Sequence, residues 1–402
     1  MIHQKLSNII NTFAHKRLKT VECLASQSNQ HEFNGVSKLK EILGTETLKD
    51  FPVKIIYLGD SDNEIVISNT FLTWYDAREQ NPNRSPEYRL YFKNNNSMNL
   101  AKENDLFIFF QLNQNNKTQS YIIIAPESST SEKQLQWLFD IEIDLFSNRL
   151  SNQEMGNKKI DMIVTRILEF LEIEYDISND SYLDALLENF DQFPSTKVFS
   201  EYARKFAEDV NPVLDPDNAI IAYMEIENIL FKTFEKYIVE KQLQAEPFKD
   251  VDSFLSYSLS VQNRRKSRAG HSFENHLQYI FKENKVDFSY NQVTENNYKP
   301  DFVFPNIECY HNEEFNSEKL IMLAAKTTCK DRWRQALSEA NRIHSKHLIT
   351  IEPAISTKQT DQMKTENLKL VIPESIQETY DDNQIPTLMN VGSFINLVSK
   401  VS

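Results

Sequence analysis

The sequence predicts a mainly β N-terminal part followed by an α/β C-terminal part. Between residues 51 and 125, short β-branched and aromatic runs alternate with Asn-, Ser- and Pro-containing turns, which is typical of a β domain. From about residue 130 the pattern turns helical, and beyond residue 299 short apolar strands alternate with helical segments. At 402 residues the chain is long enough for two domains, each with its own core.

The expected elements follow from these patterns in chain order. Strands are expected at residues 53–58, 64–67, 88–92, 106–110 and 121–124, which favours a small barrel. A helix is expected at residues 160–171, followed by a linker from Asp180 to Thr196. Further helices are expected at residues 197–209, 217–238, 251–263 and 272–282, the first three being candidates for a dimer surface. The predicted division is residues 1–150 (mainly β), 151–190 (helical segment and linker) and 191–402 (α/β).

Several protein classes are excluded by composition. The three cysteines, Cys23, Cys309 and Cys329, are widely spaced and lack a metal-binding pattern, so we expect neither disulfides nor zinc and favour a reducing cytoplasm. His271, His276, His311 and His344 also lack zinc spacing, and structural roles are expected for them. Only six glycines occur, and none forms a phosphate-cradling loop, which argues against a nucleotide-driven enzyme. No apolar stretch is long enough to cross a bilayer, and the N-terminus lacks a signal-peptide core.

Charge is acidic in sum but uneven along the chain. A net charge of −14 by itself argues against nucleic acid, because phosphate neutralisation supplies most nonspecific affinity. Two basic runs oppose this, one at Arg264, Arg265, Lys266 and Arg268, the other at Lys326, Lys330, Arg332 and Arg334. Either run alone is usually a solvated surface. Because both flank the residues described next, contact with phosphate is the favoured interpretation.

Residues 299 to 339 carry the chemistry. Asp301 begins a short apolar strand, and Lys326 ends a second buried strand. An acid and an amine on neighbouring strand ends suit Mg²⁺-assisted phosphodiester hydrolysis, in which Lys326 would orient or deprotonate the attacking water. Asp301 could otherwise merely cap a turn, as a lone Pro-Asp usually does.

A second carboxylate has to come from outside the second strand. The position two before Lys326 is Ala324, which cannot hold a cation. Residues 331–343 show helical spacing with Glu339 beside the buried stripe, so we expect this helix to return the Glu339 carboxylate to the metal. Glu274 lies just off the apolar face of the helix expected at residues 272–282. It could contact a metal ligand without touching the metal, bind a second metal ion, or be an ordinary surface glutamate.

These motifs carry a resemblance to a known family. The runs Asn263–Glu274, Lys299–Phe302, Tyr310-His311 and Ala325–Gln335 resemble the catalytic domain of the EcoRII-type restriction endonucleases. Gln359, Met363 and the run at residues 368–373 also fall where that family has them, so the resemblance covers roughly residues 190 to 402.

The resemblance implies a fold, a reaction and partners. The fold is the PD-(D/E)XK restriction-endonuclease-like α/β fold with a relocated glutamate. The reaction is Mg²⁺-dependent cleavage of double-stranded DNA by a homodimer at a short palindrome-like target, CCWGG, cut 5′ of the first cytosine. A cytosine methyltransferase of the same target is the implied functional partner.

The resemblance also implies roles for individual residues. Catalytic roles are implied for Asp301, Lys326, Glu339, Glu274, Tyr310 and Lys330, and metal contacts for Asp301, Glu339 and the Ala325 backbone. The residues expected to bind DNA are Arg264, Arg265, Arg268, Lys330, Asp331, Arg332 and Arg334.

For the N-terminal part, the family implies a B3-like pseudobarrel that binds a second target copy as an allosteric, autoinhibitory effector domain. The expected effector contacts lie around the polar loop at residues 81–86; they are Trp74, Tyr75, Arg78, Arg84 and Arg89. The alternative is that both aromatic residues are core and the arginines ordinary surface. Two other functions remain open, a DNA-repair nickase of the same fold and a non-catalytic DNA-binding regulator. The presence of Asp301, Lys326 and Glu339 argues against the regulator.

Overall fold

The structure is a computed structural model that describes residues 5–23, 31–61, 64–81, 83–114, 117–142, 150–171, 173, 176–244 and 248–401. The chain forms two compact units: Met1–Ile173 with Ala354–Gln359, and Glu174–Pro353 with Thr360–Ser402. The β-rich unit thus comes before the α/β unit along most of the chain. The predicted division into residues 1–150, 151–190 and 191–402 stays a prediction. No helix in the described ranges is long and apolar enough to cross a membrane.

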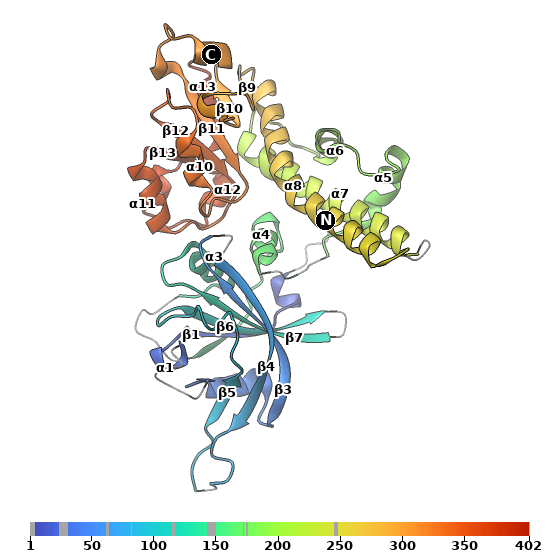
Figure 1. Ribbon diagram of the computed structural model, residues 1–402, viewed down its shortest axis with the longest axis vertical. Coiled ribbons are helices and arrows are strands. Elements are labelled where there is room, and N and C mark those ends of the chain that lie inside the picture. The colour runs from blue at the N-terminus through green and yellow to red at the C-terminus, as the bar shows by residue number, and fades with distance from the viewer. Residues whose placement is uncertain are drawn as a thin grey trace. The chain divides into compact units, whose positions relative to one another are not determined.

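The first unit is built on one curved sheet of eight strands (Figure 1). The sheet order is β2-β5-β4-β3-β7-β6-β1-β8, and only β3 and β7 pair in parallel. Four of the five predicted strands lie within observed ones, and the fifth, at residues 64–67, begins one residue before β4, so the mainly β prediction is confirmed. The strands are β1 (Thr12–Arg17), β2 (Glu32–Phe33), β3 (Leu48–Leu58), β4 (Ile65–Asp76), β5 (Tyr88–Phe92), β6 (Leu106–Gln114), β7 (Lys117–Ala125) and β8 (Ser151–Glu154).

Alternation along the strands builds the core of this unit. On β3, Val53, Ile55 and Tyr57 are buried on one face and join the cluster that contains Trp74 and Phe107. The helices of this unit are short: α1 (Thr20–Cys23), α2 (Lys40–Leu43), α3 (Thr130–Phe139) and α4 (Met162–Phe170), with 3-10 turns at Leu6–Asn8 and Ser37–Leu39. Helix α4 confirms the helix expected at residues 160–171.

The second unit begins with a helical layer. It contains α5 (Leu183–Asn189), α6 (Thr196–Ala203), α7 (Pro216–Gln244) and α8 (Val251–Glu283), with 3-10 turns at Asp180–Tyr182 and Arg204–Phe206. The predicted linker from Asp180 to Thr196 is therefore wrong in part, because α5 forms there and buries Leu186 in the core shared with Phe231 and Phe234.

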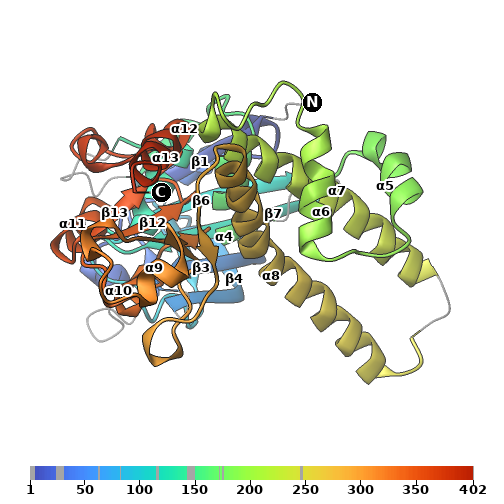
Figure 2. The same cartoon turned by 90° about the horizontal axis from the view of Figure 1, so that it is seen from above.

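Helix α8 corrects a second prediction. Residues 251–263 and 272–282 were expected as separate helices, yet they form one helix that begins with an Asp250–Ser253 capping box. The basic run between them continues the helix because Arg and Lys are good helix formers, and the single Gly270 disfavours it by only about 1 kcal/mol. Figure 2 shows the N-terminal half of α8 extending away from the sheet of its own unit.

A five-stranded sheet completes this unit, in the order β13-β12-β11-β10-β9. β9 (Ser289–Tyr290), β10 (Phe302–Phe304) and β11 (Ile321–Lys326) pair antiparallel, whereas β11, β12 (Lys346–Thr350) and β13 (Leu368–Val371) pair in parallel. The strands at the middle are almost entirely buried, as expected for a sheet covered on both faces. The remaining helices are α9 (Ile307–His311), α10 (Trp333–Ser338), α11 (Thr357–Thr365), α12 (Glu374–Gln377) and α13 (Val391–Val398), with 3-10 turns at Glu295–Asn297, Ser317–Lys319 and Ile385–Thr387.

Candidate active site

Asp301 and Lys326 lie side by side on two paired strands. Asp301 directly precedes β10, Lys326 ends β11, and Phe302 pairs with Leu323 across the antiparallel ladder. Lys326 Nζ donates to Asp301 Oδ2 at 2.8 Å, and the Ala325 N–H donates to the same oxygen at 2.7 Å. The side chains are only 19% and 16% exposed for Lys326 and Asp301. Strand pairing thus brings together the acid and the amine that the sequence suggested.

The acidic surroundings keep Lys326 charged. Burial by itself would lower the pKa of the Lys326 ammonium, but the charge and hydrogen bond of Asp301 raise it above its ordinary value, helped by Glu339 and Glu274. Lys326 is therefore a hydrogen-bond donor with a fixed positive charge at neutral pH. From the sequence, Lys326 could either orient the attacking water or deprotonate it. A lysine that stays charged can orient water and offset negative charge but cannot accept a proton, so the first role is favoured.

Glu339 approaches the pair from a loop. The helix predicted at residues 331–343 is wrong beyond Ser338, because α10 ends there and Glu339 is its C-cap, with extended backbone (φ −86°, ψ 148°). Lys346 Nζ donates to the carbonyls of Leu337 and Glu339, which satisfies the helix end, and Ala340 at φ 52° turns the chain away.

Glu339 is partly buried, and two charged side chains affect its carboxyl group. Burial raises its pKa to about 7; the charge of Lys326 lowers it and that of Asp301 raises it. Its Oε2 is buried with no hydrogen-bond partner among the described residues. A carboxyl oxygen without a hydrogen-bond partner, close to a second carboxylate, has the chemistry of a cation ligand.

Glu274 joins this group from α8. Its Oε2 accepts a 2.5 Å hydrogen bond from the Tyr290 hydroxyl on β9. Burial raises the pKa of Glu274, the Tyr290 hydrogen bond lowers it and Asp301 raises it. Glu274 is therefore an anchored neighbour of the Asp301–Lys326 pair and not an ordinary surface glutamate.

Tyr310 lies beneath the loop that carries Glu339. Its side chain is 1% exposed, and its hydroxyl donates to both Glu295 oxygens, at 2.5 and 2.6 Å. Glu295 also accepts from the Asn341 N–H at 3.3 Å, and Arg342 donates to the Tyr310 carbonyl. These contacts connect Tyr310 to the Glu339 loop, with no hydrogen bond to Asp301.

The segment after β11 contains both buried and exposed charged residues. Lys330 is buried, and its backbone N–H and that of Cys329 donate to Glu352. Asp331, Arg332 and Arg334 are exposed. Arg334 stacks its guanidinium over the Trp333 ring at 4.4 Å and donates to Gln362 at 3.2 Å. Asp331 and Arg332 thus lie in the turn just before α10, and Arg334 lies in the first turn of that helix, shortly after the strand end that holds Lys326.

The other basic run, on α8, contains one residue that the prediction placed wrongly. Arg268 is 8% exposed, donates to Asn228 at 2.7 Å and lies over the Phe231 ring, so it packs inside the helical layer and is not available to DNA. Arg265 pairs with Glu235 at 2.7 Å but keeps 43% of its side chain exposed. Arg264 is half-buried over the Phe193 ring.

In the first unit, the expected effector contacts separate into core and surface. Trp74 is wholly buried, stacks on Tyr88 and donates to the Gly44 carbonyl; the alternative that it is a core residue is correct. Tyr75 and Arg89 both bond Glu32, and Arg78 pairs with Glu87. Arg84 is exposed on the polar loop, whose Pro82 lies outside the described residues.

The histidines show no metal cluster. His276 is fully buried and paired with Glu227, and His311 Nε2 contacts the Val293 carbonyl at 3.1 Å. His271 lies 3.8 Å from Glu274, and His344 is exposed. Across the described ranges, no three His, Cys, Asp or Glu side chains form a ready-made metal cluster.

Sequence patterns did not indicate four residues near the site, because only strand pairing and loop closure bring them there. They are Tyr290, Glu295, Arg342 and Lys346.

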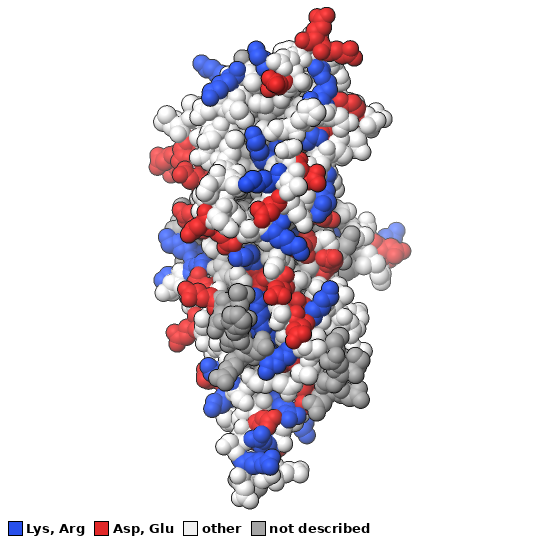
Figure 3. Space-filling view, turned by 90° about the vertical axis from the view of Figure 1, so that its left-hand side faces the viewer, with Lys and Arg blue, Asp and Glu red and all other residues white. Residues whose placement is uncertain are grey.

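Charge on the face drawn in Figure 3 is interspersed, with Lys and Arg among Asp and Glu. Any affinity of this face for an anion therefore depends on local groups of basic residues rather than on a broad positive field.

The mixed sheet, the strand-end acid and lysine, and the buried acids around them define the α/β part as a domain of the PD-(D/E)XK restriction-endonuclease-like fold. Residues 231–395 match the family model described as EcoRII C terminal. This match covers about two fifths of the chain and agrees with the resemblance that the sequence motifs carry.

Several known proteins are similar to part of the chain. The type II restriction enzyme EcoRII of Escherichia coli is 41% identical over 205 residues, which cover 51% of this chain and 50% of that protein. The chain thus spans about half the length of this curated relative. Among solved structures, metal-depleted Ecl18kI in complex with uncleaved, modified DNA has a TM-score of 0.43 and 19% identity, covering 56% of this chain and 85% of that one. The PspGI–substrate DNA complex has a TM-score of 0.44 and 15% identity, covering 52% of this chain and 93% of that one.

Proposed function

We propose that the protein is a type II restriction endonuclease that hydrolyses double-stranded DNA at a short specific site with Mg²⁺. The observation that carries this proposal is the hydrogen-bonded Asp301–Lys326 pair at two strand ends, with the buried Glu339 carboxyl in its field. The EcoRII C-terminal domain and the 41% identity to EcoRII support the same reaction. By this likeness the proposed target is CCWGG, cut 5′ of the first cytosine, with a cytosine methyltransferase as functional partner.

The donor set fits a hard divalent cation. Asp301 and Glu339 supply carboxylate oxygens, and the Ala325 carbonyl is the third proposed contact; Mg²⁺ prefers oxygen ligands and is commonly held by one or two carboxylates plus waters. The hydrogen bonds from Lys326 and from the Ala325 N–H both use Asp301 Oδ2, and Glu339 Oε2 has no hydrogen-bond partner among the described residues. When bound, the ion would lower the pKa of a water and neutralise charge on the phosphate.

The side chains of the site divide the remaining work. Lys326, held charged beside Asp301, donates to the attacking water or to a phosphate oxygen and offsets the negative charge that grows in the transition state. Glu274, held by Tyr290, fixes the electrostatic environment of Asp301 from the α8 side. Tyr310, Glu295 and Arg342 hold the loop that presents Glu339, so we assign Tyr310 a positioning role.

A direct test is digestion of plasmid by the purified full-length protein with Mg²⁺. We expect discrete fragments whose ends map to one short sequence, and loss of cutting when EDTA replaces Mg²⁺ or when the target cytosines are methylated. Nicks spread over one strand would favour the repair nickase, and intact plasmid with a shifted duplex would favour the non-catalytic regulator.

Recognition is proposed to depend on the turn that begins α10. Arginine makes bidentate hydrogen bonds to guanine worth roughly 1 to 3 kcal/mol. Arg332→Ala should therefore weaken cognate duplex binding by about tenfold or more and leave nonspecific binding nearly unchanged. Competition titrations with cognate and scrambled duplexes measure both constants. Equal losses on the two DNAs would show that Arg332 contacts only phosphate.

Homodimer formation is proposed through the exposed half of α8. Val251, Phe254, Leu255 and Leu259 are 71%, 46%, 50% and 57% exposed, and their spacing puts them on one side of the helix. An exposed apolar stripe of this kind commonly marks a protein interface. A second copy of the chain would cover it and would supply the second active site that double-strand cleavage requires.

The raised pKa of Glu339 gives a pH-dependent stability in metal-free protein. In the folded state the pKa of this carboxyl is about 7, whereas in the unfolded chain it returns to its ordinary value of 4.5. Stability is therefore lost as pH rises between these values. Metal-free Glu339→Gln should become more stable than wild type by about 2 kcal/mol between pH 5 and pH 8. Urea unfolding at both pH values measures the gap, and a gap that does not widen would contradict the assigned burial.

A further inference from the structure

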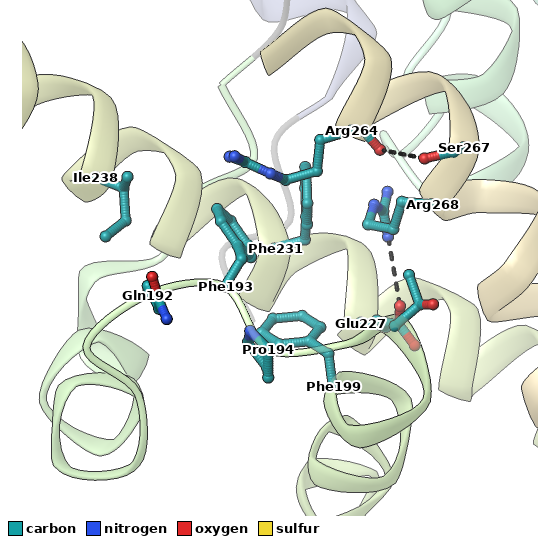
Figure 4. Close-up of a pocket in the computed structure, with 11 residues that line it drawn as sticks. Gln192, Phe193, Pro194, Phe199, Glu227, Phe231, Ile238, Arg264, Ser267 and Arg268 are labelled. Carbon is teal, nitrogen blue, oxygen red and sulfur yellow. Dashed lines mark hydrogen bonds and ion pairs between the residues drawn. The ribbon is translucent and has the colours of Figure 1, made fainter. Parts of the chain in front are cut away.

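A cavity of about 390 Å³ lies in the helical layer of the second unit, apart from the Asp301 site (Figure 4). It is formed by the segment that leads into α6 and by one side of α7 and α8. Its lining combines aromatic and aliphatic side chains with charged and polar ones. The lining residues are Gln192, Phe193, Pro194, Thr196, Phe199, Glu227, Phe231, Ile238, Arg264, Ser267 and Arg268.

Two charged residues of the cavity, Glu227 and Arg268, already have partners within the protein. Glu227 is fully buried, accepts from the Ser272 hydroxyl and lies 2.9 Å from His276 Nε2 and 3.8 Å from Arg268 Nη1. Arg268 also donates to Asn228 at 2.7 Å. This network joins α7 to α8, and the negative charge of Glu227 offsets the positive charge of Arg268.

Arg264 is different. Its guanidinium lies over the Phe193 ring at 4.6 Å from the centroid, and its Nη1 is buried with no hydrogen-bond partner among the described residues. Stacking on a ring face attracts the cation but does not satisfy its N–H groups. A buried donor without an acceptor is destabilising, and more so when the group is charged. Figure 4 shows the guanidinium above Phe193, while Arg268 points away toward Glu227.

We propose that this cavity binds a small flat apolar molecule that carries one carboxylate. The carboxylate accepts from Arg264, in the geometry that guanidinium and carboxylate share. The ring system lies among Phe193, Phe199 and Phe231. A cavity of this volume falls in the range of small-molecule sites, which combine apolar walls with few placed polar groups. A single negative charge fits because the positive charge of Arg268 is already offset.

The first test compares two probes on the full-length wild-type protein by isothermal titration calorimetry. 2-Naphthoate and 2-naphthamide have the same ring system and differ in the anionic group. We expect 2-naphthoate to bind at least about tenfold more tightly, which corresponds to 1.4 kcal/mol, and to raise the melting temperature. Equal affinities, or no binding of 2-naphthoate at millimolar concentration, would overturn the proposal without any variant.

Variants then locate the site. Arg264→Gln should bring the two probes to equal affinity, and Lys282→Gln, on the same helix but outside the cavity lining, should keep the preference for the acid. Phe193→Leu should weaken both probes, because it removes a wall of the site. If Arg264→Gln folds, as judged by circular dichroism, and still prefers 2-naphthoate, the carboxylate binds elsewhere and the assignment fails. None of these readouts depends on DNA cleavage.

Discussion

Loss of any one of Asp301, Lys326 and Glu339 should reduce cleavage of cognate plasmid by at least about 1,000-fold, since each removes a charge that acts on the reacting phosphate. Because Asp301 and Lys326 are hydrogen-bonded to each other, the two alanine substitutions should differ in how much they destabilise the fold. Asp301→Ala leaves a buried lysine without its acceptor, whereas Lys326→Ala leaves a carboxylate that still accepts from the Ala325 N–H. We therefore expect Asp301→Ala to be the less stable protein and Lys326→Ala to be the better folded one.

The comparison needs a variant that removes charge nearby without touching the site. Lys319→Ala, in the 3-10 turn before β11, meets this requirement. Each site variant should still shift cognate duplex and sediment like wild type. Cleavage retained within tenfold by Asp301→Ala, Lys326→Ala or Glu339→Ala would show that the assigned residue is not part of the machinery.

Removal of residues 1–175, which include all of the first unit except Ala354–Gln359, should speed cleavage of single-site DNA by roughly tenfold, within the usual range of allosteric coupling. This prediction concerns the proposed effector role, in which binding of one target copy relieves inhibition of cutting at another. A chain beginning at Asp176 keeps the Asp176–Lys236 ion pair and the Asn179–Thr233 hydrogen bond, which attach the start of the second unit to α7. Initial rates on a plasmid with one target, for full-length and shortened protein, measure the effect.

Added duplex provides the matched experiment on the intact chain. A short duplex that carries the target should stimulate full-length protein and only compete with the shortened one. If the shortened protein shows no gain and the duplex inhibits both, the first unit is a specificity or dimerisation module. Circular dichroism of the shortened protein shows whether it is folded, so that inactivity through misfolding is recognised.

The sequence was a good guide where the signal is local. Asp301 and Lys326 stand at the ends of short apolar strands, and neighbouring strands bring strand-end side chains together. The strands of the first unit were equally visible, because alternation of buried and exposed side chains is a property of adjacent residues.

The errors have a common physical source in distant contacts. The predicted helix at residues 331–343 stops at Ser338 because Lys346, on the following strand, binds the carbonyls at its end. Arg268 resembles its basic neighbours in sequence, yet Asn228 and Phe231 of α7 take its side chain. Trp74 occurs beside a polar loop, but the fold buries it. Local patterns could not distinguish these cases, because the deciding partners lie far away in the chain.

Because α8 is one continuous helix, the number of residues between two positions fixes the angle between their side chains about the helix axis. Leu255 of the exposed stripe and Glu274 of the candidate site are carried on one unbroken helix, separated by about 28 Å at 1.5 Å per residue. One inserted residue between them would rotate one end relative to the other by about 100° while lengthening the helix by only about 1.5 Å. In the proposed dimer, the length of this helix segment should therefore matter more than its composition, since the length sets the angle between the exposed stripe and the candidate site.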